Sequence, residues 1–257
     1  MSGRFSDCHA KGCRTPAASN EVEKMRNGIG ELKERTLHAT LKNLLQPDQA
    51  KQEVKCCGYV ADIRDENRII EIQTGNFHSM KDKLRCYLEN GYDVTIVYPV
   101  TRTKWLIWID QSNGNLTKKR RSPKTGVPQE LFYELVYLKE FLPHERLHFH
   151  ICMVDTEEYR NLNGWSNDRK RGSTRAERIP VAMESWIMLD TPQDFEKLLP
   201  ESLDDTFCVK DFAAACRISE TLASRGITVL TKLGVIRRIG KKGRAYVYEK
   251  THANSEE

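Results

Sequence analysis

Two short apolar runs joined by a polar turn, within residues 59–74, constrain the fold of this chain more than any other feature. In the second run, two isoleucines alternate with Glu71 and Gln73. A period of two predicts a strand with its apolar side chains on one face and its polar ones on the other. Asp62 lies in the first run, across the turn. We therefore expect two carboxylates and an amide on one side of a hairpin, an oxygen-rich set that suits a hard divalent cation.

These residues resemble the PD-(D/E)XK nuclease superfamily, in which an Asp is followed, after a short gap, by Glu/Asp-x-Lys on the next strand. Here the match is Asp62 and Glu71-Ile72-Gln73, with Ala61 in place of the motif proline and Gln73 in place of the lysine. The string Ile-Glu-Ile-Gln-Thr-Gly-Asn-Phe also resembles an uncharacterised bacterial family, which joins such a core to a C-terminal winged helix. The core resemblance covers roughly residues 30–110.

The resemblance implies a restriction-endonuclease-like α/β fold, with a mixed sheet and flanking helices, and phosphodiester hydrolysis that depends on Mg²⁺ or Mn²⁺. Asp62 and Glu71 would hold the metal, and Gln73 would orient the attacking water or a phosphate oxygen. An amide cannot carry positive charge or act as a base. Lys81 or Lys83, in the helix expected over residues 79–89, is therefore a candidate for the missing cation, with Lys104 and Lys124 as weaker phosphate contacts.

A first helix is expected from about residue 31 to residue 45, with its leucines on one buried stripe. Glu34 shares the inward face of that helix, and His38 lies one turn from it. The resemblance implies that Glu34 is a third metal ligand. The alternative is an ordinary glutamate favoured by the helix dipole. Glu31, a turn further out, is a less favoured ligand.

Composition limits the class of protein. The chain has 257 residues, of which 39% are hydrophobic and 30% charged, as in soluble globular proteins. No apolar run approaches the length that spans a bilayer, and the first residues lack an apolar signal-peptide core. A cytoplasmic location without membrane contact is the expectation.

Eight cysteines occur without any Cys-x-x-Cys pair, and several lie in apolar runs, as reduced core cysteines do. Cys8, His9 and Cys13 could be half of a metal site. They lie in residues 1–28, a polar segment that we interpret as a flexible tail, and their role stays open.

Basic residues indicate a nucleic-acid partner. The formal net charge is +5, and the positive side chains gather near turns. Together they could neutralise a phosphate backbone, although each group alone could be a solvated loop. The groups are Lys118–Arg121 with Lys124, Arg169–Arg171 with Arg175 and Arg178, and Arg237–Arg238 with Lys241, Lys242 and Arg244.

After the first helix and the hairpin, residues 29–190 are expected to form the nuclease-like domain. Strands are expected over residues 93–99, 104–110, 147–154 and 179–189, and helices over 79–89 and 127–142. Residues 155–178 read as a mobile basic loop. His148 and His150 alternate with apolar residues, which favours a solvated or hydrogen-bonded strand face over a metal site.

Residues 191–257 predict a winged helix-turn-helix, with helices near 193–199 and 209–216, a third helix capped by Ser219, and a basic hairpin. The candidate nucleic-acid contacts are Arg225, Lys232, Lys241, Lys242 and Arg244, with Thr221, Ser224 and Thr228 exposed beside them. Gly226 lies in the middle of the third helix, where glycine lowers helix stability. Use of the module for protein contacts remains the alternative.

The preferred interpretation is a metal-dependent DNA nuclease. The second is a non-catalytic DNA-binding regulator with a degenerate nuclease core, which the glutamine at position 73 favours. A third, a protein-interaction scaffold, predicts no affinity for nucleic acid. The choice between DNA and RNA, the substrate sequence and the oligomeric state stay open, with a homo-oligomer as one option.

Overall fold

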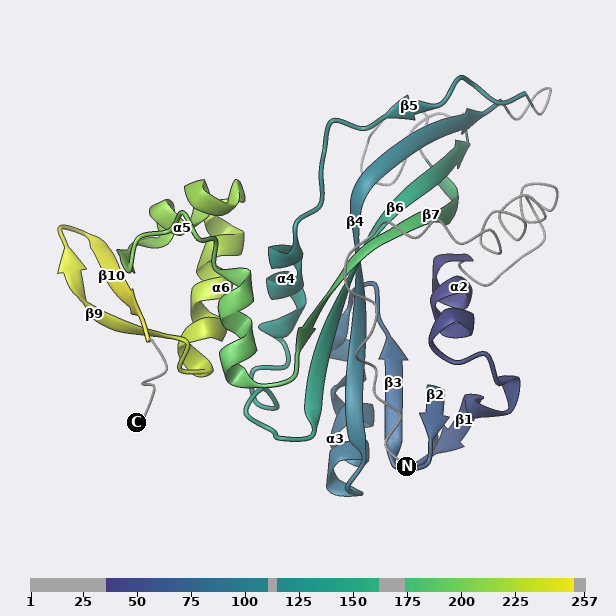
Figure 1. Ribbon diagram of the computed structural model, residues 1–257, viewed down its shortest axis with the longest axis horizontal. Coiled ribbons are helices and arrows are strands. Elements are labelled where there is room, and N and C mark those ends of the chain that lie inside the picture. The colour runs from purple at the N-terminus through teal and green to yellow at the C-terminus, as the bar shows by residue number, and fades with distance from the viewer. Residues whose placement is uncertain (1–35, 111–114, 162–173, 252–257) are drawn as a thin grey trace.

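A mixed sheet forms the centre of the molecule (Figure 1). The structure, a computed structural model, describes residues 36–110, 115–161 and 174–251. The seven-stranded sheet has the order β1-β2-β3-β4-β6-β7, with β5 paired to β4. Its strands are β1 (Gln52–Cys56), β2 (Tyr59–Asp65), β3 (Arg68–Ile72), β4 (Asp93–Ile109), β5 (Arg120–Arg121), β6 (Leu147–Asn161) and β7 (Thr174–Leu189).

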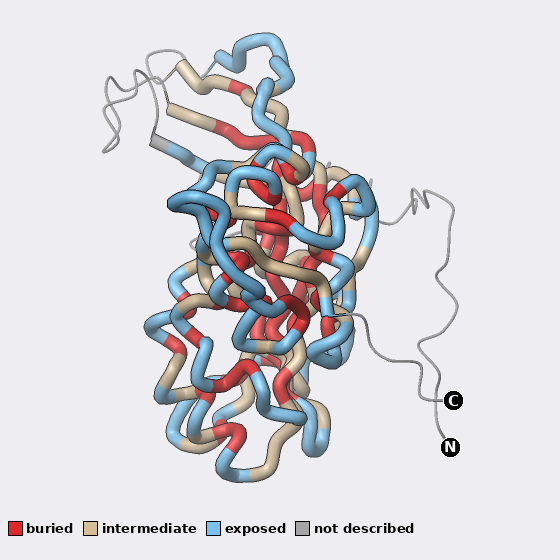
Figure 2. The backbone as a smooth tube through the Cα atoms, turned by 90° about the vertical axis from the view of Figure 1, so that its left-hand side faces the viewer, coloured by how far each residue is buried: buried red, intermediate tan, exposed pale blue. Residues whose placement is uncertain are grey.

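Strand direction changes across the sheet. The pairs β1–β2, β2–β3 and β6–β7 are antiparallel, whereas β3–β4 and β4–β6 are parallel. The parallel centre is covered on both faces, and Figure 2 shows the buried segments running through the middle of the molecule. The expected mixed α/β class with flanking helices is therefore confirmed.

Two strand predictions were wrong in their extent. The segments 93–99 and 104–110, expected as two strands, form the single strand β4, with a register shift between Thr101 and Lys104. Much of the loop expected over 155–178 is also strand, because β6 continues to Asn161 and β7 begins at Thr174. The charged residues that suggested a loop form ion pairs across the strands, which a sequence pattern does not reveal. Residues 162–173 lie outside the described part of the chain.

Helices cover the two faces of the sheet, whose side chains alternate along β4. Ile96 and Tyr98 belong to the main core, whereas Val97 packs in a second cluster beneath Leu37 and Leu41. These two leucines belong to α2 (Thr36–Leu45), which η1 (Gln49–Lys51) follows. The main core is covered by η2 (Phe77–Met80), α3 (Lys81–Glu89), η3 (Pro128–Leu131) and α4 (Phe132–Leu135).

The helix expected over 127–142 is shorter than predicted. It is a 3₁₀ turn, one α-helical turn and further tight turns. In the last part, Leu138 N donates to Leu135 O at 2.9 Å and Phe141 N to Leu138 O at 2.8 Å, which are three-residue spacings. The apolar residues of this segment are buried all the same, so the prediction of a core segment holds although its helical type does not.

The C-terminal module has two α-helices and a small antiparallel sheet of order β8-β10-β9. The first helix expected there is a 3₁₀ helix with a capping box at Thr191. The elements are η4 (Pro192–Leu198), β8 (Thr206–Phe207), α5 (Val209–Cys216), α6 (Glu220–Lys232), β9 (Ile236–Lys242) and β10 (Ala245–Lys250).

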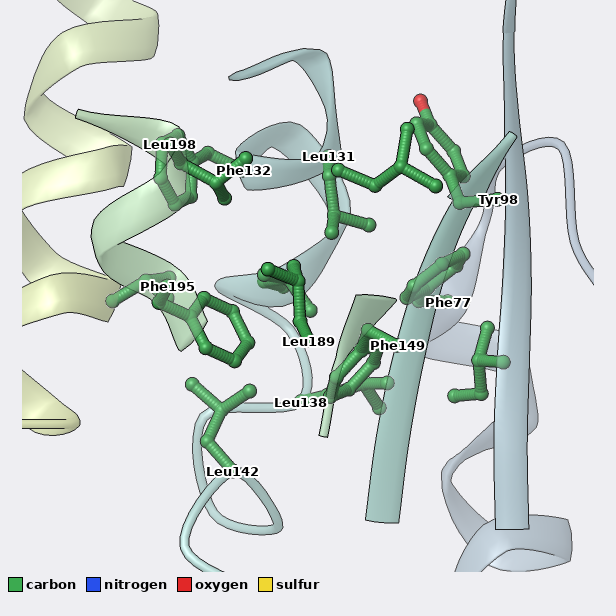
Figure 3. Close-up of a cluster of buried hydrophobic side chains, with 14 of the residues drawn as sticks. Phe77, Tyr98, Leu131, Phe132, Leu138, Leu142, Phe149, Leu189, Phe195 and Leu198 are labelled. Atoms are coloured by element: carbon green, nitrogen blue, oxygen red, sulfur yellow. The ribbon is translucent and has the colours of Figure 1, made fainter. Parts of the chain in front are cut away.

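One hydrophobic core runs through the main sheet and the C-terminal module. The rings of Phe132 in α4 and Phe212 in α5 meet with centroids 6.4 Å apart, and both side chains are fully buried. Figure 3 shows Phe149 and Leu189 of the sheet beside Phe195 of η4. The module is therefore packed firmly on the sheet domain.

Gly226 lies where α6 approaches the aromatic side chains of this shared core. A Cβ atom at this position would lie 2.8 Å from Cδ2 of Phe132 and 3.0 Å from Cε1 of Phe212. Glycine in the middle of this helix lowers helix propensity, as expected, but it lets α6 lie against both rings.

Candidate active site at the β2–β3 hairpin

The hairpin places Asp62 and Glu71 beside each other. The last paired residues of β2 and β3 are Ile63 and Ile70, one step before the two acidic residues. Just beyond this pair, Oδ2 of Asp62 accepts a hydrogen bond from the backbone N–H of Ile72 at 2.7 Å. The Asp62 side chain therefore takes part in the hydrogen bonding between the strands, which fixes its position.

Asp62 is also held from α2. Nε2 of His38 lies 3.1 Å from Oδ2 of Asp62, and the Asp62 side chain is only 15% exposed. Burial alone would raise the pKa of Asp62. The hydrogen bond and charge of His38, the N–H of Ile72 and the charge of Lys83 together lower the pKa below its ordinary value. Asp62 therefore carries its negative charge at neutral pH.

The contact of His38 with Asp62 was missed from the sequence. His38 was noted there only for its spacing from Glu34. The residues lie on separate elements, 24 positions apart, so no local pattern indicates the contact.

Glu71 is completely buried and pairs with Lys83 of α3, whose Nζ lies 2.6 Å from Oε2. The other carboxylate oxygen, Oε1, is buried without a hydrogen bond within the described part of the chain. Burial and the negative charge of Asp62 raise the pKa of Glu71 to about 7, although Lys83 opposes this rise. A carboxylate that titrates near neutral pH beside an ionised one is typical of functional sites.

Of the two candidate lysines on α3, Lys83 reaches the site and Lys81 does not. Nζ of Lys81 instead lies 3.2 Å from Oε1 of Glu140. Gln73 lies just after β3, half-buried, and its backbone N–H donates to the carbonyl of Val97 at 2.9 Å. Lys83 on the neighbouring helix therefore brings a positive charge to the hairpin, where position 73 is a glutamine.

A metal ion at this hairpin would have a small protein ligand set. Within the described residues, no group of three or more His, Cys, Asp or Glu side chains is placed to hold a metal. The carboxylates of Asp62 and Glu71 are of the ligand type that Mg²⁺ takes, since this ion commonly binds one or two carboxylates and completes its coordination with water and substrate phosphates. The buried Oε1 of Glu71 without a hydrogen bond is consistent with such a role. Glu34, Glu31, Cys8, His9 and Cys13 lie outside the described residues.

Glu71 predicts a specific pH dependence of stability. Its pKa is about 7 in the folded chain and ordinarily 4.5, so between these values the folded chain holds a proton that the unfolded chain has lost. The contribution of Glu71 to the free energy of unfolding therefore falls as the pH rises from 4.5 to about 7, by about 3 kcal/mol in total. Urea denaturation of wild type and Glu71→Gln should show this fall in their difference from pH 4.5 to 8. A constant difference would contradict it. Asp62, whose pKa is lowered, changes the pH dependence of stability only at more acidic pH.

The two strand histidines are hydrogen-bonded, as expected. Nε2 of His150 lies 2.9 Å from Oδ1 of Asp190, and Nδ1 of His148 lies 3.2 Å from the Asp190 carbonyl. They thus tie β6 to the end of β7.

The five candidate nucleic-acid contacts are not equivalent in the structure. Lys232, Lys241, Lys242 and Arg244 are exposed, on the last turn of α6 and on the β9–β10 hairpin. Arg225 instead donates to the carbonyl of Tyr133 at 2.9 Å, with its guanidinium 5.3 Å from the centre of that ring. Arg225 therefore takes part in docking α6 onto α4, a role that its sequence position did not indicate.

The fold and the hairpin define an α/β protein with a carboxylate pair at a sheet strand and a small helical module packed beside it. The chain belongs to the family described as domain of unknown function DUF8091, whose model matches residues 35–190. It is also similar to an uncharacterized protein of Treponema pallidum (strain Nichols), with 25% identity over 234 residues that cover 86% of this chain and 87% of that protein. No solved structure matches the chain. None of the described helices is long and apolar enough to cross a membrane.

Proposed function

We propose that this protein is a metal-dependent nuclease that hydrolyses phosphodiester bonds in DNA. The observation that carries the proposal is the buried Glu71 carboxylate, which pairs with Lys83 and whose pKa is raised by its burial and by the negative charge of Asp62. Two carboxylates and a cation on adjoining elements match the chemical needs of phosphoryl transfer, which are charge neutralisation and positioning.

Each residue has a distinct role in the proposed reaction. Asp62 and Glu71 hold a Mg²⁺ or Mn²⁺ ion, which would supply positive charge and lower the pKa of a bound water. His38 keeps Asp62 in position from α2. Lys83 offers its ammonium group to the negative charge that develops on the scissile phosphate, and Gln73 orients the attacking water or a phosphate oxygen.

Lys83 provides a test of this assignment with a matched control. Replacing Lys83 by Met should lower Mn²⁺-dependent cleavage of plasmid DNA by about 100-fold, because one preorganised positive group is lost. Lys81→Met removes the same charge two residues away, from a lysine that pairs with Glu140, and should cleave within about twofold of wild type. Equal rates for both variants would show that Lys83 is not the missing cation.

The C-terminal module is proposed to be a winged helix-turn-helix that binds the DNA backbone. Support comes from the exposed row Thr221, Ser224, Thr228 and Lys232 along α6. The β9–β10 hairpin adds exposed cations, and Nζ of Lys241 lies 4.6 Å from the ring centre of Tyr246. An aromatic ring with a nearby cation on an exposed hairpin suits contact with nucleic acid.

The hairpin predicts salt-dependent binding. Replacing Lys241, Lys242 and Arg244 by Ala should weaken binding to duplex DNA by about tenfold and make the slope of log affinity against log salt shallower by up to about 3. Fluorescence anisotropy in EDTA measures both values, with Asp62→Ala as a control that should bind like wild type. Unchanged affinity at every salt concentration would assign the module to another partner. Point substitutions are preferable to deletion of residues 191–257, which would expose the shared core.

A specific observation favours the second candidate, a non-catalytic DNA-binding regulator. Glu71 has no exposed surface and is already paired with Lys83, an arrangement that could serve only to stabilise the hairpin. This candidate predicts DNA binding that depends on the C-terminal hairpin, without cleavage in Mg²⁺ or Mn²⁺. Plasmid cleavage that disappears in Asp62→Ala would exclude it.

A further inference from the structure

A strongly basic stretch of chain lies beside the C-terminal half of β4 and has no role in the proposed function as described above. Residues 115–126 contain five lysines and arginines and no acidic residue. Figure 1 shows this stretch passing through β5 at the far end of the main sheet and then running to α4. We call residues 115–126 the basic segment. Its positive residues are Lys118, Lys119, Arg120, Arg121 and Lys124.

The backbone of the basic segment is hydrogen-bonded to β4. The N–H of Thr117 donates to the carbonyl of Trp108 at 2.9 Å, and the N–H of Ser122 donates to the carbonyl of Lys104 at 2.8 Å. Between these two bonds, β5 pairs with β4 in antiparallel register. The four consecutive positive residues are therefore presented by an ordered, extended backbone. Such preorganisation reduces the entropy that is lost when a partner binds.

Two further contacts fix the basic segment to the sheet. Nζ of Lys119 lies 2.6 Å from Oε1 of the buried Glu157 and 4.7 Å from the ring centre of Trp105. The N–H of Gly126 donates to the carbonyl of Thr101 at 3.1 Å, and a Cβ atom at position 126 would lie 2.2 Å from this oxygen. Glycine thus lets the segment return to β4, and the charge of Lys119 is neutralised within the protein.

The other positive charges of the basic segment face solvent. Lys118, Arg120 and Arg121 are exposed, and no acidic side chain of the described residues forms an ion pair with them. Lys124 has only a long contact of 3.9 Å with Glu130. Like charges held side by side repel one another, and a polyanion that lies across them removes this repulsion. The segment therefore suits a partner with closely spaced negative charges.

We propose that the basic segment binds the phosphate backbone of a polynucleotide, about ten base pairs away from the candidate active site. A phosphate backbone is a row of regularly spaced negative charges. Arginine donates in a planar fork that matches phosphate oxygens, and charge-assisted hydrogen bonds of this kind are strong.

The distance follows from the register of β4. Glu71 is paired with Ile96 of this strand, and Arg120 is paired with Leu106, ten residues further along it. Ten residues of strand span about 33 Å, and duplex DNA rises about 3.4 Å per base pair. This distance rests on the proposed function, because it takes Glu71 as part of the cleavage site. A substrate cleaved at the hairpin must then extend about ten base pairs to reach the basic segment.

Binding of DNA without a metal tests the proposal. A fluorescein-labelled 30-base-pair duplex and its single strand are titrated in EDTA at several NaCl concentrations. The triple variant Lys118→Gln, Arg120→Gln and Arg121→Gln should bind the duplex about tenfold more weakly, with a salt slope shallower by up to about 3. Wild-type affinity in the triple variant would overturn the proposal and would leave the charges as protection of the β5 edge against other strands.

A charge-matched control separates the basic segment from the general charge of the protein. Lys55, Arg85 and Lys139 are exposed on β1, on α3 and after α4. Replacing all three by Gln removes the same charge and should leave affinity within about threefold of wild type. An equal loss of affinity in the control and the triple variant would show that the basic segment has no special part in binding, which overturns the proposal.

A conservative variant separates charge from folding. Arg120→Lys with Arg121→Lys keeps both charges, and its affinity should lie much closer to wild type than that of the triple variant. Thermal denaturation establishes that each variant is folded. Poly-L-glutamate is the probe for an acidic protein partner. If wild type binds poly-L-glutamate as tightly as DNA, and the triple variant loses both equally, the nucleic-acid assignment is overturned.

The outcome is distinguishable from that of the nuclease proposal. If the protein cleaves DNA, the triple variant should raise KM for the 30-base-pair duplex by about tenfold and leave kcat within about twofold, because the basic segment lies far from Glu71. Cleavage that requires Asp62, with unchanged DNA binding in the triple variant, would reject the basic segment alone. Weakened binding in the triple variant, without any cleavage by wild type in Mg²⁺ or Mn²⁺, would support the basic segment and reject the nuclease activity.

Discussion

Replacing Asp62 by Ala or Glu71 by Gln should lower the rate of metal-dependent DNA cleavage by at least about 100-fold. Loss of a residue that only orients a metal ligand typically lowers activity by about 10- to 100-fold. Loss of a metal ligand itself should lower activity by more than that. Both side chains lie on the same hairpin, where Asp62 accepts the N–H of Ile72 and Glu71 pairs with Lys83. Initial rates on supercoiled plasmid in Mg²⁺ and in Mn²⁺ measure the effect.

A third aspartate on the same hairpin provides the control. Asp65 of β2 pairs with Lys51 at 2.7 Å, is partly exposed and contacts neither Glu71 nor His38 in the described structure. Asp65→Asn should cleave at the wild-type rate, because an exposed ion pair contributes little. Circular dichroism and thermal denaturation establish that each variant is folded. If Asp62→Ala and Glu71→Gln both cleave as fast as wild type, this hairpin is not the active site.

Replacing Gly226 by Ala should destabilise the protein, although alanine is the better helix former. The added methyl group would lie 2.8 Å from Cδ2 of Phe132 and 3.0 Å from Cε1 of Phe212, and both of these side chains are fully buried. Overpacking of this kind lowers stability by about 1–3 kcal/mol, against a gain in helix propensity of up to about 1 kcal/mol. Thermal denaturation should therefore show a lower melting temperature, by several degrees.

Ser224 lies on the same helix and provides the opposite case. Its side chain is exposed, so Ser224→Ala adds helix propensity without a clash and should leave the melting temperature unchanged or slightly raised. A Gly226→Ala variant with a raised melting temperature would mean that α6 can move away from α4 with little loss of folding free energy. The close contact of Arg225 with Tyr133 would then be weaker than its geometry indicates.

Local patterns were sufficient for several features of this chain. The period-two alternation around Glu71 predicts a strand, and the polar turn before it predicts a hairpin that brings Asp62 near. Both are present, with β2 and β3 paired as a hairpin. The helical spacing in α3 and the capping serine at position 219 are likewise local, so α3 was predicted with nearly the observed bounds and α6 with the observed start. The nuclease activity and the metal remain proposals.

Local sequence patterns did not predict that charged residues lie within the long strands. Glu157 and Glu158 read as loop residues in the sequence, yet both are buried in β6 at 1% exposure. Their partners come from β4, β6, β7 and the segment near β5, which includes Lys119 at 2.6 Å from Glu157. A buried charge in a strand is tolerated where an opposite charge lies beside it, and when that partner is on another strand the sequence spacing does not reveal the contact.

The sequence by itself determined those elements that depend on residues close together along the chain. They are the acidic hairpin, the amphipathic helices and the basic turn between β9 and β10. The tertiary structure alone decided which lysine reaches Glu71, that His38 holds Asp62, and that Gly226 is a contact point of two aromatic rings. It also gathered three cations around Glu158. The physical reason is that burial and charge pairing depend on neighbours in space, and these neighbours lie on separate strands and helices.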